Sequence, residues 1–553
     1  MNNQPVTVNG HTVSLSDPSS SGRRGWRQIT GFSALLLLFL LGMVPAIRAT
    51  GVLVKNYSFY HDEIWNAPQA VSLLRGECWR RAYSLPVGRL ALPVVSGPYQ
   101  GAIKTYLLVP WIACFGTSPL SLRSANVALF AFFLAAMYWA LRPVSRQLAA
   151  LSLLLPWALP ATTTFVPTDH GPFLVAWILI AMGLGFLARF ATAHTEGALV
   201  SAVACFSLLV TDKITNTPVA VVGITAVALL ALRTKQTKLL LRPATLGALA
   251  LPLLPWVIYF ASNGFNELLA NTAGPSLPVM QRAARFFPSL FAALTGRHEA
   301  VVLTGKWPQH FSLLLFPFLV SIPLLMCLVT LFRKVTASSL FWSLFTGALV
   351  GVFCFIAIPG LTRPWHYLPF YPILLFLSFF AVSRVPWKPL AALFFAAIVG
   401  LGVRDSVYHE RVLSFLMSNP GTGYTSPALN QLLPKLRAHG VETILCLNYS
   451  LCNPLFVLAG GKLQIIDATW WTEDPKSWQR IVSLLSSRGR AAVWREILDA
   501  KQRNPQEIRW LNQKTIWARE MQRNPGPPLA TEVLDDSRGT RFYLSFLPEN
   551  SPR

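Results

Sequence analysis

The chain has 553 residues, of which 53% are hydrophobic and only 13% are charged, with a mean hydropathy of +0.46. A soluble domain usually carries about 25% charged residues, so this composition excludes a soluble enzyme and a disordered chain. Its seven cysteines are too few for a disulfide scaffold. The excess of 47 basic over 23 acidic residues is typical of cationic cytoplasmic loops in a membrane protein. We therefore expect a mainly α, polytopic membrane protein that binds no nucleic acid.

Hydropathy predicts the order of the membrane-spanning helices. Residues 1–30 are expected to form a disordered cytoplasmic tail. A spanning helix needs about 20 apolar residues, and the transmembrane domain, residues 31–403, offers about eleven such segments. They are predicted at residues 31–49, 120–141, 148–166, 171–189, 197–212, 214–232, 243–262, 311–332, 338–359, 365–383 and 387–403.

One further apolar stretch, Ile103 to Phe115, is short and is interrupted by Pro110, so we predict a helix on the membrane surface. With the N-terminus inside, eleven spans place most basic clusters in the cytoplasm. The long loops 50–119 and 263–310 and the C-terminal region then lie outside a plasma or inner membrane. If this stretch spanned the membrane, most of the basic clusters would face outward.

Residues 404–553 have the composition of a small extracytoplasmic α/β domain. Leucines at helical spacing predict a helix over 429–436, followed by a strand at 441–447, a short helix at 454–458 and a strand at 463–466. Cys446 and Cys452 would lie in an oxidising compartment. The sequence leaves two alternatives: the two cysteines form a disulfide, or Cys452 is a buried thiol.

Acidic residues are scarce between residues 31 and 403, so each one there is informative. Asp62 and Glu63 follow the first span in the segment Tyr60-His61-Asp62-Glu63-Ile64-Trp65. Adjacent carboxylates at a membrane boundary can serve as a general base, a metal ligand or a cation clamp. The alternative interpretation is a solvated loop turn.

Two more acidic positions are predicted at the outer ends of spans. Asp169 and His170 lie between the third and fourth spans, where Asp169 could instead only cap the next helix. Asp212 and Lys213 lie between the fifth and sixth spans. Lys213 could bind a phosphate as a point charge, and mutual neutralisation of this pair is the alternative.

Further cations and aromatic residues are expected on the same outer side. Lys104 follows a Gly/Pro-rich turn in the first loop, and Arg363, His366 and Tyr367 lie at the outer start of the tenth span. Together with His170 and Lys213, they are the candidate substrate-binding residues. Arg363 offers bidentate donors that suit phosphate, whereas Trp365 and Tyr367 could be interfacial belt residues. The chain has no Walker loop, no paired Cys-x-x-Cys and no His-Glu-x-x-His, which argues against a nucleotide-driven pump and a structural zinc site.

The order of these features resembles the GT-C glycosyltransferases, in particular the branch of protein O-mannosyltransferases and the lipid A aminoarabinose transferase. The resemblance covers roughly residues 31–403 and depends on short motifs in a fixed order. The matching segments are His61-Asp62-Glu63, the turn from Gly97 to Lys104 with the following 106–116, Arg123, and Thr168-Asp169. The family often has Lys-Pro-Pro in this turn, whereas this chain has Ala102-Ile103-Lys104-Thr105.

The resemblance implies an inverting hexosyl- or pentosyltransferase with a polyprenyl-phosphate sugar donor and a lipid, glycan or protein acceptor. Asp62 matches the family's catalytic aspartate, with Glu63 beside it and Asp169 as the second outer acid. Lys213, Arg363 and Lys104 would stabilise the lipid phosphate. No cofactor is certain, and whether a divalent metal lies between Asp62 and Asp169 is open. The alternative function is a non-enzymatic lipid or glycolipid transporter or flippase, although acids at the outer rim and the lack of a repeat favour the enzyme.

Overall fold

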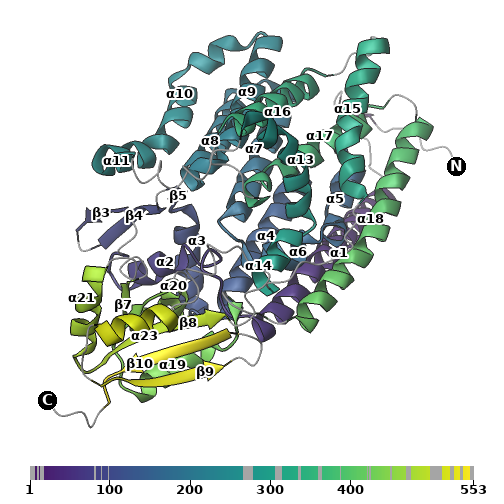
Figure 1. The fold of residues 1–553 in the computed structure, drawn as a ribbon. Helices are drawn as coiled ribbons and strands as arrows, with labels where there is room; N and C mark the ends of the chain where they lie inside the picture. The colour runs from purple at the N-terminus through teal and green to yellow at the C-terminus, as the bar shows by residue number, and fades with distance from the viewer. Residues whose placement is uncertain are drawn as a thin grey trace.

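The computed structural model describes a helical bundle with a small sheet domain at one end (Figure 1). It describes residues 7–8, 11–12 and 18–548, apart from 80–82, 89, 98, 266–277, 305–313, 334–337, 359–363, 386–387, 420, 422–424, 449–450, 469–474, 498–513, 524–527 and 536–539. The N-terminal strands β1 (Thr7–Val8) and β2 (His11–Thr12) pair with each other.

Seven helices in the described part of the chain are long and apolar enough to cross a membrane, as expected for a multi-pass protein. They are Phe32–Asn56 in α1 (Pro18–Asn56), α4 (Pro119–Leu141), α7 (Phe173–Ala193), Ile214–Arg233 formed by η2 (Ile214–Asn216) and α9 (Thr217–Arg233), Pro243–Asn263 formed by α10 (Pro243–Ala250), η4 (Leu251–Leu253) and α11 (Leu254–Asn263), α16 (Ser339–Ala357) and α18 (Lys388–Ser418). Three shorter apolar helices are α3 (Ile103–Phe115), Pro317–Leu328 in α15 (Leu315–Arg333), and α17 (Phe370–Ser383).

The predicted count of eleven spans is therefore not confirmed. The prediction of one continuous helix over 148–166 is wrong, because this segment forms α5 (Arg146–Ser152), η1 (Leu155–Ala158) and α6 (Ala161–Thr168). Pro156 and Pro160 lie at the breaks, and proline has no backbone N–H for a helical hydrogen bond. The helix predicted to end at residue 403 continues to Ser418 in α18, while α8 (Glu196–Asp212) matches the predicted 197–212 segment.

Small residues let the helices approach closely. A side chain at Gly185 in α7 would collide with the ring of Trp139 in α4, at 2.1 Å. A side chain at Gly347 in α16 would lie 2.5 Å from the carbonyl oxygen of Val222 in α9. Large buried side chains, among them Trp177 and Phe206, fill the rest of the core.

The long loops carry secondary structure of their own. The first contains α2 (Ala67–Leu74) and an antiparallel sheet of β3 (Tyr83–Val87), β4 (Leu90–Gly97) and β5 (Gln100–Gly101). The second contains α13 (Val279–Leu294) and α14 (Arg297–Thr304). The remaining short helices are η3 (Thr237–Leu241) and η5 (Pro364–Tyr367).

The C-terminal region is an α/β domain, as its sequence predicts. The described helices and strands are α19 (Leu429–Ala438), β6 (Thr443–Cys446), α20 (Cys452–Leu458), β7 (Gln464–Asp467), α21 (Pro475–Leu485), β8 (Arg490–Ile497), α23 (Lys514–Arg523), β9 (Ala530–Asp535) and β10 (Thr540–Phe546). The sheet order is β7-β6-β8-β10-β9, with β6 parallel to both of its neighbours. Cys446 and Cys452 are both buried free thiols.

Alternate residues of β6 explain the two layers of helices around the sheet. Ile444 faces the cluster that includes α19 and α20, and Leu445 faces the cluster that includes α21. Phe456 of α20 also belongs to one hydrophobic cluster with Phe59 and Ile64 of the first long loop. The domain therefore rests on the loop that carries Asp62, as Figure 1 shows beside α2.

Candidate functional site

Four loops meet at one end of the bundle and bring together acids that are far apart in the sequence. The first loop, residues 57–66 between α1 and α2, carries Asp62 and Glu63. The second, between α6 and α7, carries Asp169 and His170, and its Gly171 donates its N–H to the carbonyl oxygen of Asp62 at 3.3 Å. Helix α14 and the junction of α8 with η2 complete the cluster.

Glu63 is fully occupied by a buried ion pair. Arg123 near the start of α4 donates from Nε to Oε1 at 2.7 Å and from Nη2 to Oε2 at 3.1 Å, and both side chains are at most 1% exposed. Arg123 also donates to the carbonyl oxygens of Tyr57 and Ser58, and the N–H of Tyr60 donates to Glu63. This pair holds the shape of the first loop.

Asp169 is also fully occupied, by Lys104 and a backbone donor. Lys104 Nζ lies 2.7 Å from Oδ2, and the N–H of Leu174 in the first turn of α7 donates to Oδ1 at 3.0 Å. Asp169 therefore accepts one N–H of the first turn of α7, although Pro172 is the N-cap residue of that helix, and the ion pair gives the carboxylate a second role. Its backbone has a φ of 41°, the left-handed region that aspartate tolerates better than most residues.

A third acid, Glu299 of α14, joins Asp62 through His170. His170 Nε2 lies 3.0 Å from Asp62 Oδ2, and its Nδ1 lies 3.0 Å from Glu299 Oε2. The Thr168 hydroxyl lies 3.1 Å from Glu299 Oε1 and 2.7 Å from the carbonyl oxygen of Thr164, so its one proton has two acceptors. The His170 ring also stacks on Trp365 of η5, with 4.8 Å between ring centroids, and lies 4.7 Å from the ring of Tyr60.

Asp62 differs from the other acids because its side chain is open. It is 20% exposed, whereas the side chains of Glu63, Asp169 and Glu299 are at most 1% exposed. Within the described chain, its side chain bonds only to His170, through Oδ2. Oδ1 is thus free to accept a hydrogen bond from a substrate.

Lys213 supplies a cation beside this open carboxylate. A Cβ built on Gly171 would lie 2.7 Å from Lys213 Nζ, so the ammonium lies against the loop that holds Asp62. Lys213 Nζ lies 5.7 Å from the centroid of the Tyr99 ring and makes no hydrogen bond or ion pair with any residue that the structure describes. It forms no direct ion pair with Asp212, although the two charges favour each other. Asp212 Oδ2 receives a 3.4 Å contact from Asn216, and its Oδ1 has no partner among the described residues.

The Gly/Pro-rich turn before α3 is held against the end of α8. The N–H of Ile214 donates to the carbonyl oxygen of Tyr99 at 3.1 Å, and Gln100 forms a bridge with Lys213. A Cβ on Gly101 would lie 1.7 Å from the carbonyl oxygen of Thr211, so only glycine fits there. This contact fixes Lys104, three residues later, beside Asp169.

The residues predicted at the start of the tenth span do not share one set of surroundings in the structure. Arg363 lies outside the described residues. Tyr367 is buried, with its ring 4.4 Å from that of Phe355, and the ring of His366 lies 5.8 Å from that of Trp365. The structure therefore brings Trp365, expected only as a possible belt residue, to His170. Glu299 is the other site residue that sequence reasoning missed, because its loop carries no motif.

The electrostatic surroundings of Asp62 and His170 favour their charged forms. Burial raises the pKa of Asp62, but the hydrogen bond and charge of His170, with the charges of His61 and Lys213, lower it to about 2. Burial lowers the pKa of His170, but Glu299 and Asp62 outweigh it and raise this pKa to about 10. Burial also raises the pKa of Asp169 above its usual range, against the opposing charge of Lys104.

The arrangement does not fit a divalent metal between Asp62 and Asp169. Among the described residues, no three His, Cys, Asp or Glu side chains are placed to hold a metal ion. Lys104 and the N–H of Leu174 occupy both oxygens of Asp169, and His170 occupies Oδ2 of Asp62, so only Asp62 Oδ1 is open to a metal. Cationic side chains of the chain itself occupy this position.

No family model and no curated protein matches the chain. The structure is similar to that of the oligosaccharyltransferase of Archaeoglobus fulgidus in the apo form, with 13% identity, a TM-score of 0.45, and coverage of 85% of this chain and 70% of the other. The AglB protein of the same organism, in complex with an inhibitory peptide and a dolichol-phosphate, is 12% identical to the chain. Its TM-score is 0.46, and the match covers 86% of this chain and 70% of the other. Their identities and TM-scores mark distant likenesses.

Proposed function

We propose that the protein is a membrane glycosyltransferase that moves a hexose or pentose from a polyprenyl-phosphate donor to a hydroxyl group of a lipid, glycan or protein acceptor. The observation that carries this proposal is the open carboxylate of Asp62, next to Lys213 and among acids that are otherwise buried and paired. A transporter without chemistry would not need one exposed carboxylate oxygen at the head of the bundle.

In this mechanism Asp62 is the general base. The acceptor oxygen attacks the anomeric carbon as the bond from that carbon to the phosphate oxygen breaks, with inversion, and Asp62 Oδ1 takes the hydroxyl proton. A pKa of about 2 makes Asp62 a weak base. This is sufficient if the proton moves late, because an acceptor hydroxyl that has begun to bond to an oxocarbenium-like carbon is strongly acidic.

Lys213 would stabilise the departing lipid phosphate, which leaves as a stable anion and needs a cation more than a proton. Its ammonium lies beside Asp62 and makes no ion pair in the described part of the chain. Burial lowers the pKa of Lys213, and the charges of Asp62, Asp212 and Asp169 oppose this shift. Arg363 is proposed as a second phosphate ligand from the sequence, while Lys104 acts chiefly through Asp169.

We also propose that this site and the C-terminal domain face the outside of a plasma or inner membrane. In a variant that lacks the seven native cysteines, a single cysteine in place of the exposed Lys462 should react with an impermeant thiol reagent in intact cells. A cysteine in place of the exposed Lys238 should react only after the membrane is opened. The reverse labelling would contradict this topology.

The proposed reaction is tested by Asp62→Asn in the purified full chain with synthetic polyprenyl-phosphate hexoses and pentoses. This change keeps the size of the side chain and removes its basicity, so transfer should slow by roughly 10²- to 10⁴-fold while donor binding is kept. Glu77→Gln is the matched control, because Glu77 lies in an exposed ion pair with Arg75. Transfer by Asp62→Asn at the parental rate would contradict the assignment, and lipid movement without transfer by the parent would favour a flippase.

A further inference from the structure

The hydrogen bonds of His170 show how many protons the cluster of Asp62, His170 and Glu299 holds. It holds one proton more than a neutral imidazole with two ionised carboxylates would. Both ring nitrogens lie 3.0 Å from a carboxylate oxygen, Nε2 from Asp62 and Nδ1 from Glu299. An ionised carboxylate can only accept, and a neutral imidazole has only one N–H donor. Two hydrogen bonds therefore need two protons, so either the ring is an imidazolium or one carboxyl group is protonated.

We propose that Glu299 is a positioning residue that acts through His170. The two hold this extra proton beside Asp62, which fixes the orientation of the Asp62 carboxylate and sets the alkaline limit of activity. This inference deepens the proposed function and depends on Asp62 being its base. Glu299 itself is fully buried and does not reach the open side of Asp62.

The contacts around Glu299 suit this role. Its Oε2 contacts His170 and its Oε1 lies 3.1 Å from the Thr168 hydroxyl, so polar contacts on both oxygens fix its orientation. The Trp365 ring covers one side of the imidazole, 4.8 Å away and nearly parallel at 24°, and Tyr60 lies 4.7 Å away on another. The ring thus cannot turn away without breaking both hydrogen bonds and its stacking contact.

Other charged groups near the cluster remain in place when Glu299 is changed. Lys213 lies against Gly171, His61 acts on Asp62 through its charge, and Lys104 and Asp169 form a separate pair. His298 of α14 packs on the other aromatic partner, with 4.9 Å between its ring and that of Trp365. Removing the charge of Glu299 therefore isolates its effect on His170.

The sign of the effect follows from the folded-state pKa. Since the pKa of His170 is raised from 6.5 to about 10, the stability that the extra proton contributes is complete below about pH 6.5 and is lost as the pH rises through about 10. Above that pH the ring has one N–H for two carboxylates, so Asp62 loses its donor or Glu299 is left unpaired.

The first measurement needs no substrate. Thermal unfolding of the full chain in detergent is followed from pH 6 to pH 10.5 for the parent, Glu299→Gln and the exposed control Glu77→Gln. Glutamine keeps the size of the side chain and one acceptor oxygen, for either His170 or Thr168, and removes the charge. We expect the parent to be more stable than Glu299→Gln below about pH 8, with a gap that shrinks toward pH 10, whereas the gap to Glu77→Gln stays constant.

The second measurement is the pH profile of kcat/KM. Loss of an opposite charge in hydrogen-bond contact should move the alkaline limb of the Glu299→Gln profile down by about 1 to 3 pH units. Glu299→Asp, which keeps the charge, should restore most of the parental limb. A role in folding alone would lower activity at all pH values without this displacement.

The outcomes separate this inference from the proposed function. Superimposable pH profiles and a pH-independent stability gap for Glu299→Gln would overturn the inference, even if Asp62→Asn is inactive. If Glu299→Gln does not fold, His170→Gln provides the test. The stability of the parent changes between pH 6.5 and 10, and this change should be absent in His170→Gln. If no variant or parent transfers sugar, the unfolding measurement still tests the proton-holding cluster.

Discussion

Two buried histidines in this protein have opposite surroundings. His170 is 2% exposed and each ring nitrogen lies 3.0 Å from a carboxylate oxygen. His409 of α18 is fully buried, but neither of its ring nitrogens has a hydrogen-bond partner among the described residues. Its nearest aromatic contact is Trp157, at 5.8 Å between ring centroids. Burial of a histidine therefore does not by itself indicate a site.

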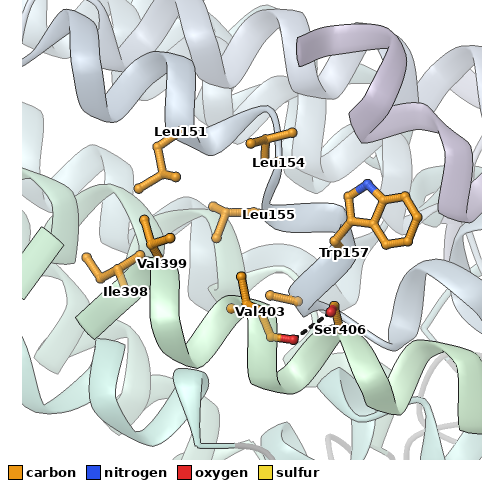
Figure 2. A pocket seen from close by; sticks show the side chains of 10 residues that line it. Leu151, Leu154, Leu155, Trp157, Ile398, Val399, Val403 and Ser406 are labelled. Atoms are coloured by element: carbon orange, nitrogen blue, oxygen red, sulfur yellow. Dashed lines mark hydrogen bonds between the residues drawn. The ribbon is translucent and has the colours of Figure 1, made fainter. Parts of the chain in front are cut away.

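The surroundings of His409 explain this difference. Asp405, one turn earlier in α18, accepts from the N–H groups of Leu314 and Leu315 at 3.1 and 2.9 Å and so holds the start of α15. Beside Trp157 lies a cavity of about 230 Å³ between η1 and α18, and Figure 2 shows apolar side chains around it. Carboxylates at the candidate site hold side chains from other segments, whereas Asp405 of α18 holds the backbone of α15 and pairs with its neighbour Arg404.

The largest effect is expected from breaking the ion pair of the candidate site. Arg123→Ala would leave Glu63 buried without its cation, and removal of one partner of a buried pair typically costs about 3 to 5 kcal/mol of unfolding free energy. Denaturant or thermal unfolding of the purified protein measures this loss.

The α18 side offers a matched control for that measurement. Arg48 and Glu410 form an ion pair whose side chains are 47% and 48% exposed, so Arg48→Ala should cost less than about 1 kcal/mol. Equal losses for the two variants would show that the bonds of Arg123 to Glu63 and to the loop carbonyls contribute no more to the unfolding free energy than an exposed ion pair does.

A smaller effect is expected at Lys213, which lies at the open side of the cluster. Lys213→Gln should weaken binding of a polyprenyl-phosphate sugar by about 1.5 to 3 kcal/mol, the usual range for a hydrogen bond to a charged group. Donor binding to the protein in detergent is measured for this variant and for Lys462→Gln, an exposed residue of the C-terminal domain. Unchanged donor affinity in Lys213→Gln would leave this lysine as a neutralising neighbour of Asp62 only.

Part of this site could be predicted from the sequence. Asp62 and Asp169 stand out because acids are rare between residues 31 and 403, and Lys104 because it follows a Gly/Pro-rich turn at the start of a predicted surface helix. The leucine spacing of α19 and the apolar run of β6 also predict the first elements of the C-terminal domain. These are local sequence patterns, and they can be recognised without knowing which residues they contact in the fold.

The rest depends on contacts between distant segments. Glu299 lies 129 residues from His170 in a loop without a motif, so only the fold reveals their hydrogen bond. Likewise, the sequence presents Asp62 and Glu63 as an equivalent pair. Arg123, 60 residues away, occupies Glu63 and leaves Asp62 as the open acid. The broken helix at 148–166 was missed because hydropathy counts apolar residues and ignores the missing N–H groups of Pro156 and Pro160.

The smallest effect is expected at His409. His409→Phe removes two buried ring nitrogens that have no partner among the described residues, and an unsatisfied buried polar group costs about 1 to 3 kcal/mol. The larger phenyl ring is strained against Trp157, and this strain offsets part of the gain. The unfolding free energy should therefore stay the same or rise by roughly 1 kcal/mol. The same substitution at His170 should lower both stability and transfer, because it leaves Glu299 buried without its partner. A clear loss of stability in His409→Phe would mean that the α18 histidine is held by polar contacts after all, and the contrast between the two histidines would then fail.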